Sequence, residues 1–219
     1  MDGYGIDQKI RFGYAKASKK LGSEFSLYRA TSPLDPLDAG NFQGVVKCVF
    51  TVAWDWMKAN KPGNAIWNLL TDGQDSSGIL NVSLKDFLVS GTQTFFVLAK
   101  QYQMPMLGVE CNATIKIIRP SQSTAIGALP YGGYTPDGSE TLVIGMPCSN
   151  LIDRVGQNSK VSLPTSTKDS TWNILMPSIG DIEIRTGDIA IDQDSQNYLI
   201  GSTELTDFGW RMKTVRMVT

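Results

Sequence analysis

Histidine is absent from the 219 residues of this chain, and its absence limits the chemistry that the protein can perform. Without histidine there is no Ser-His-Asp triad, no Cys-His pair, no imidazole-bound metal and no histidine general base. An enzyme with this sequence would have to work with carboxylates, lysine or tyrosine. The composition therefore argues against most hydrolytic and metal-dependent mechanisms.

Carboxylates occur in two close pairs, Asp72 with Asp75 and Asp192 with Asp194. A glycosidase needs two carboxylates about 5–10 Å apart across a sugar-binding cleft, and calcium also prefers oxygen ligands. Both pairs lie among Gly, Ser and Gln, which favour turns, and neither begins an EF-hand loop ending in Glu. We predict that these aspartates stabilise turns, that the protein is not an enzyme, and that it has no catalytic residue, no metal site and no cofactor.

The cysteines, Cys48, Cys111 and Cys148, are odd in number and lack a Cys-x-x-Cys spacing. This arrangement favours neither a zinc site nor a set of paired disulfides. Free cysteine is among the most frequently buried residue types. We therefore predict three buried thiols.

Basic side chains are concentrated near the N-terminus, although the whole chain has 20 basic and 21 acidic residues. Lys9, Lys16 and Lys20 lie along the flank of a helix predicted over 6–21, where apolar residues recur every three or four positions and Gly22 ends the pattern. The lysines predict a docking surface for an acidic partner or for nucleic acid. The alternative is a solvated helix edge. The apolar face of this helix is expected to consist of Ile6, Ile10, Tyr14, Ala17 and Leu21.

Further partner contacts are expected from apolar residues in loops, because only 19% of the residues are charged, below the roughly 25% typical of soluble proteins. Met104 and Met106 flank Pro105 in a candidate contact loop, since methionine adapts readily to a partner surface; the alternative is a buried segment that leads into a strand. Tyr131 and Tyr134 are further candidates in a Gly/Pro-rich stretch. Trp54, Trp56 and Tyr102 are also expected at the surface. The alternative for each aromatic residue is ordinary core or loop packing.

The rest of the chain is typical of β-structure, with β-branched and alternating apolar segments from Asn41 onward. We predict a mainly β protein with a helical arm and a Pro-containing linker over 1–40. A first β-barrel or sandwich unit follows over 41–119, then a Gly/Pro-rich linker over 120–139 and a second unit over 140–219.

An internal repeat supports two similar units. The segment Trp67-Asn68-Leu69-Leu70 matches Trp172-Asn173-Ile174-Leu175. Further along, Asp86 matches Asp188 and Phe96 matches Tyr198, provided that the first copy has a three-residue insertion after its Trp segment. The repeat predicts an internal duplication in which these residue pairs occupy equivalent positions.

The C-terminal unit carries a motif with a recognisable relative. A Gly187-Asp188 strand, an Asp-rich turn and the strand from Tyr198 form a predicted hairpin, followed by Glu204-Leu205-Thr206-Asp207-Phe208-Gly209-Trp210-Arg211. This segment resembles the small β-barrel of head–tail connector (neck, stopper or head-completion) proteins of tailed bacteriophages. The resemblance implies a structural virion protein that forms a ring of six or twelve copies. Its expected neighbours are portal or adaptor, tail terminator and tail tube proteins, and nucleic acid would meet it only inside the ring.

The alternative is a tail-tip or adsorption-apparatus β-sandwich that binds carbohydrate or a receptor through exposed aromatic residues and polar loops. The N-terminus, beginning Met1-Asp2-Gly3, lacks the pattern of a secretory signal, and no run of about 18 apolar residues occurs. We expect synthesis in a host bacterial cytoplasm, a final location in the virion neck or tail, and no membrane contact.

Overall fold

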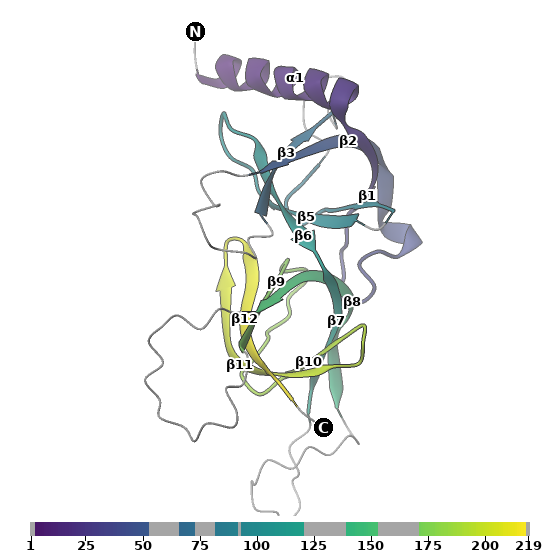
Figure 1. The fold of residues 1–219 in the computed structure, drawn as a ribbon, viewed down its shortest axis with the longest axis vertical. Helices are drawn as coiled ribbons and strands as arrows, with labels where there is room; N and C mark the ends of the chain where they lie inside the picture. The colour runs from purple at the N-terminus through teal and green to yellow at the C-terminus, as the bar shows by residue number, and fades with distance from the viewer. Residues whose placement is uncertain are drawn as a thin grey trace, which may run out of the picture.

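The computed structural model describes residues 3–52, 66–72, 82–91, 93–120, 139–152 and 171–217. The helix α1 (Gly3–Leu21) comes first and is followed by two closed, six-stranded antiparallel β-barrels. Figure 1 shows α1 across one end of the long axis, the first barrel beneath it and the second barrel beyond. The predicted fold, a mainly β protein with a helical arm and two similar units, is confirmed.

The two barrels share one topology. In each barrel the first three strands are neighbours in chain order, and the last three close the barrel in reverse order. The first barrel consists of β1 (Ser23–Tyr28), β2 (Phe42–Val52), β3 (Ile66–Thr71), β4 (Phe87–Ser90), β5 (Gln93–Ala99) and β6 (Met106–Cys111), with a 3-10 turn, η1 (Ala39–Asn41), before β2. The second consists of β7 (Ala113–Arg119), β8 (Glu140–Ile152), β9 (Thr171–Met176), β10 (Ile189–Asp192), β11 (Asn197–Thr206) and β12 (Gly209–Arg216).

The unit boundaries differ from the predicted ones. Strand β1, assigned to the arm, pairs with β2 and β4 in the first barrel, and β7, assigned to the first unit, pairs with β8 and β10 in the second. The stretch 120–139 therefore connects β7 to β8 and is not a linker between units. A single residue, Asn112, joins the barrels, and its side chain bonds the backbone of Asn150 in both directions (2.7 and 2.8 Å).

The predicted Pro-containing linker also has a different role. It belongs to the β1–β2 connection and lies against the second barrel. Leu34 forms a β-bridge with Ile144, the Asp35 N–H donates to Ile144 O (3.0 Å), and the Ile144 N–H donates to Pro33 O (3.2 Å). This connection fastens the first barrel to the second.

The duplication holds for two of the three predicted residue pairs. Trp67 and Trp172 occupy the same register on β3 and β9, and Asp86 and Asp188 directly precede β4 and β10. The third predicted match is displaced by one residue. Tyr198 is the partner of Ala190 in the second barrel, and its counterpart in the first barrel is Phe95, the partner of Leu88, and not Phe96.

The length of one turn explains the displacement. Ser90 pairs with Gln93 in the first barrel, whereas the Asp192 N–H donates to Gln196 O (3.1 Å) in the second, which leaves one more residue in that turn. Ser195 in the longer turn has φ of +61°, as three-residue hairpin loops require. A shift of one residue turns a side chain to the opposite face of its strand. Tyr198 therefore faces its barrel interior, as Phe95 does.

Phe96 belongs instead to a contact between the barrels. Outward-facing residues of β4, β5 and β6 are buried and join the hydrophobic cluster that fills the second barrel. Strand β6 also contacts β8 directly. A separate cluster fills the first barrel. The outward-facing residues that link the two barrels are Phe87, Phe96, Leu98, Leu107 and Val109.

Candidate functional site

The helix α1 is held on the first barrel by a buried carboxylate. Asp7 accepts a bond from Arg11 Nε one turn along the helix (2.6 Å) and another from the Gln103 N–H in the β5–β6 connection (2.9 Å). Burial raises the pKa of Asp7, but the bonds from Arg11 and Gln103 outweigh it, so the pKa lies below 3.8, its ordinary value. Asp7 is therefore charged at neutral pH and fixes the helix against this connection.

The buried face of α1 differs from the predicted apolar face. Asp7, Ala15 and Ser18 are buried, whereas Ile6 is exposed and Leu21 is 78% exposed. The predicted helix and its end at Gly22 are correct, but the helix is rotated about its axis relative to the predicted orientation. The side chains that meet the barrel are Asp7 and the small residues Ala15 and Ser18. A small residue at the contact lets the helix approach the strands closely, and Asp7 is paired despite its burial.

The outward face of α1 is basic and carries an exposed aromatic ring. Lys9, Lys16 and Lys20 are all exposed, and Phe12, which the sequence analysis did not single out, is 69% exposed between them. An exposed Phe among lysines is compatible with a docking surface, and the alternative of a solvated helix edge stays open. The spacing of Phe12 from Lys9 and Lys16, three and four residues, could have revealed this face.

The β5–β6 connection, which bonds Asp7 on the barrel side of α1, also has exposed side chains. Met104 is 53% exposed and Tyr102 is also exposed, as predicted, beside the residue that binds Asp7. Met106 is only 4% exposed and lies in the core of the first barrel, so its proposed role as a surface contact is wrong. Tyr131, Tyr134, Trp54 and Trp56 lie outside the described residues. We call Lys9, Phe12, Lys16, Lys20, Tyr102 and Met104 the helix-end surface.

Each barrel has the same buried ion pair. Asp86 accepts two bonds from Arg29 (2.9 and 2.8 Å) and one from the Ser83 N–H (2.6 Å). Asp188 likewise accepts two bonds from Arg119 (both 3.0 Å) and one from the Arg185 N–H (2.8 Å). Arg29 directly follows the first strand of its barrel and Arg119 is the last residue of the first strand of the other, while each aspartate precedes the fourth strand. The pair therefore closes each barrel between these strands.

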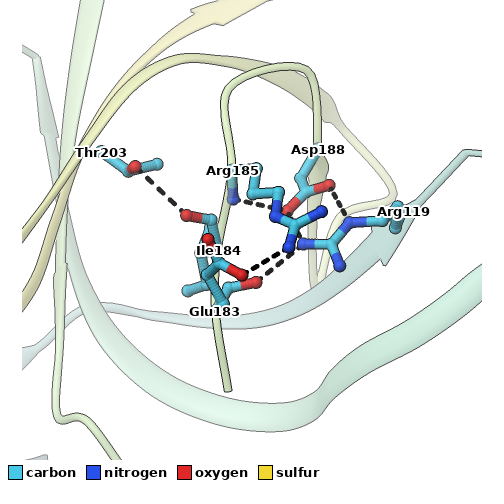
Figure 2. A network of polar contacts seen from close by, with 6 residues as sticks. All are labelled: Arg119, Glu183, Ile184, Arg185, Asp188 and Thr203. Carbon is cyan, nitrogen blue, oxygen red and sulfur yellow. Dashed lines mark hydrogen bonds and ion pairs between the residues drawn. The ribbon is translucent and has the colours of Figure 1, made fainter.

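Figure 2 shows how this pair is extended in the second barrel. Arg119 also donates to Glu183 O (2.7 Å), Arg185 pairs with the Glu183 carboxylate (2.5 Å), and Thr203 donates to Ile184 O (3.2 Å). The network binds the 183–185 segment to β7 and β11. Its charged groups are paired with one another, which indicates a structural role.

Of the paired aspartates, Asp192 lies in a turn, as predicted, whereas Asp72 bonds the neighbouring strand β2. Asp72 accepts the Lys47 N–H (2.6 Å), and Asp192 accepts the N–H groups of Asp194 and Gln196 (both 2.9 Å). Asp75 lies outside the described residues. No group of three potential metal ligands occurs within the part of the chain that the structure describes.

The cysteines are free thiols, two of them fully buried. Cys48 and Cys148 occupy equivalent positions, since each pairs with the first residue of its barrel, and Cys111 is half-buried. Burial raises the pKa of Cys48 to about 12 and also raises the pKa values of Cys111 and Cys148. All three therefore remain protonated at neutral pH and are poor nucleophiles.

Comparison of the chain with protein-family models, curated proteins and solved structures finds no match. In the described ranges, no helix has the length and hydropathy needed to cross a membrane.

Proposed function

We propose that this chain is a structural subunit of a tailed-phage virion, located at the head–tail junction as one member of a ring of six or twelve copies. The observation that carries the proposal is the helix-end surface, in which Lys9, Phe12, Lys16 and Lys20 are exposed on α1 and Tyr102 and Met104 are exposed in the β5–β6 connection. A surface of this kind suits a protein whose role is to bind neighbours.

The closed barrels limit the kinds of contact that neighbouring proteins can make. Both sheets are closed, so neither offers a free edge for adding a strand of another chain. Contacts with neighbours must therefore use side chains and connections. Besides the helix-end surface, Leu205 and Phe208 are exposed at the turn between β11 and β12, within the motif that resembles connector proteins.

The proposed neighbours are copies of this chain together with portal or adaptor, tail terminator or tail tube proteins. In this arrangement the helix-end surface binds an acidic patch of a neighbouring protein, because charge complementarity directs such contacts. A location at the tail tip, with carbohydrate or a receptor as ligand, is the competing proposal.

Quantitative mass spectrometry of purified phage particles tests the proposal. The chain is expected in a multiple of six copies, with antibody labelling at the neck in electron micrographs. Absence from the particle, or one to three copies, contradicts a ring. Labelling at the far end of the tail favours the receptor-binding alternative.

Charge reversal tests the helix-end surface. Lys9, Lys16 and Lys20 are exposed, so replacing all three with Glu should leave the fold intact, at about 0.5 kcal/mol or less per substitution. We expect phage carrying the triple variant to lose infectivity and to accumulate unjoined heads and tails. Lys116→Glu, an equally exposed change on β7, is the control. Full infectivity of the triple variant contradicts a docking role for α1.

A further inference from the structure

A cavity of about 380 Å³ opens in the first barrel beside the C-terminal end of α1. Its volume lies within the roughly 300–1,000 Å³ typical of small-ligand sites. Side chains can fill the interior of a six-stranded barrel completely, so the fold itself does not require a cavity of this size. The residues that give the cavity its chemistry are Phe25, Phe50, Phe95, Trp67 and Glu110.

Three of these aromatic rings pack against one another. Phe50 and Phe95 are stacked with centroids 3.7 Å apart, and Phe25 meets them edge to face at 5.3 and 6.0 Å. Packing of this kind fixes the rings in place. The faces of aromatic rings carry partial negative charge and attract cations. Phe25 and Phe95 are both only 3% exposed, so the half-buried Phe50 is the ring of these three that can present a face to a ligand.

A carboxylate lies among the same rings. Glu110 Oε2 accepts a hydrogen bond from Trp67 Nε1 (3.1 Å), which holds the side chain in the cavity wall. Glu110 is half-buried and, in the described part of the chain, forms no ion pair. A partly desolvated carboxylate gains free energy from a cation placed beside it.

The second barrel shows that the fold does not require this set of residues. The strand registers make Glu110 equivalent to Arg216, which reverses the charge, and make Phe50 equivalent to Asn150. Phe25 is likewise replaced by Ile115, whereas Trp67 is kept as Trp172. Arg216 bonds Gln196 in its own barrel. The second barrel keeps aromatic residues at two of these positions, Trp172 and Tyr198, but has a base in place of the acid.

We propose that the cavity of the first barrel binds an organic cation, with the cationic group held by the Glu110 carboxylate beside the half-buried rings of Phe50 and Trp67. The ligand class is an alkylated ammonium or a guanidinium group. Such a group reaches the site either as a small amine or as a side chain of a neighbouring protein. The inference goes beyond the proposed structural role and stands without it.

Calorimetric titration of the full chain tests this site. The probes are choline, the neutral alcohol 3,3-dimethylbutan-1-ol of the same shape, and N-acetylarginine methylamide. We expect saturable binding of at least one cation and about tenfold weaker binding of the neutral alcohol. Choline binding alone identifies a small quaternary amine as the source, and binding of the arginine derivative alone identifies a protein side chain. Binding of both supports the shared chemistry.

Two matched variants localise the binding. Glu110→Gln keeps an oxygen that accepts from Trp67 Nε1 but removes the charge, so cation affinity should fall about tenfold while the circular dichroism spectrum is unchanged. Arg216→Gln, at the equivalent position of the second barrel, should leave affinity unchanged. Three results overturn the proposal: no saturable binding of either cation, equal binding of the neutral alcohol, or equal affinity of Glu110→Gln and the unmodified chain.

Discussion

At the scale of single residues, the two arginine–aspartate pairs are the most specific contacts that the barrels share. Asp86 and Asp188 have side chains that are almost fully buried, and each accepts three hydrogen bonds. Removing the carboxylate takes away these three bonds, but the arginine side chains are 40% and 26% exposed and remain in contact with water. Losing hydrogen bonds to a charged group costs about 2 kcal/mol.

We therefore predict that Asp86→Ala and Asp188→Ala each lower the free energy of unfolding by about 2 kcal/mol. Urea unfolding followed by circular dichroism measures the change. Glu183→Gln is the control, because Glu183 and Arg185 are both exposed and such surface pairs contribute little to stability. If the three variants are equally stable, the buried pairs do not hold the barrels closed.

The sequence revealed half of this arrangement. The repeat placed Asp86 and Asp188 in equivalent positions, because each precedes a strand with a similar apolar pattern. Their partners are 57 and 69 residues away, so no local pattern could identify Arg29 and Arg119. The Phe96–Tyr198 match failed for a related reason: one added turn residue changes the face of the strand without changing its composition.

At the scale of elements, α1 shows what periodicity can and cannot predict. Apolar spacing and Gly22 gave the helix and its end, but its buried face contains Asp7 and Ser18, which a hydrophobic pattern treats as outward. The orientation of the helix depends on the bond between Asp7 and Gln103, which lies 96 residues away and so contributes to no local pattern.

The contact of α1 with the barrel should depend on pH. The folded-state pKa of Asp7 lies below the unfolded value, so its contribution is fully present above about pH 4 and is lost as the pH falls through the folded pKa. Hydrogen exchange of α1 amides should accelerate in acid relative to the barrel strands. Asp7→Asn should show fast α1 exchange already at pH 7, with little further change in acid. Equal α1 protection in both proteins at pH 7 would contradict this role.

The β11–β12 hairpin depends on one glycine. Gly209 has φ of +107°, and a Cβ there would lie 2.3 Å from Met176 O, a backbone atom that cannot move aside. Gly209→Ala should therefore lower stability by about 3 kcal/mol or more, through both the strained φ and the clash. Gly91→Ala is the matched control, because Gly91 also has a positive φ, +54°, but open space around it. Its cost should be about 1 kcal/mol, as thermal unfolding of both variants will show.

At the scale of the whole molecule, the sequence patterns correctly predicted the fold class and the two similar units, but they predicted the wrong unit boundaries. The Gly- and Pro-rich stretches each connect two strands of the same barrel, whereas the junction between the two barrels is the single residue Asn112. In a closed barrel the first strand pairs with a strand that comes later in the chain. Hydrogen-bond pairing, and not proximity in sequence, therefore decides to which barrel a strand belongs. The shared hydrophobic cluster then joins the two units into one body.

This shared cluster predicts that the two barrels unfold together. Leu107 faces outward from β6, yet it is buried in the cluster that also fills the second barrel, and strand β6 contacts β8. Leu107→Ala should lower the free energy of unfolding by about 3 kcal/mol. Because the core is common to both barrels, slow amide exchange should accelerate to the same extent in β2 and β3 as in β8 and β9. Val45→Ala, an exposed change on β2, is the control and should alter neither set. If exchange accelerates in the first barrel while the second keeps its protection, the barrels are independent folding units and the contact between them contributes little to stability.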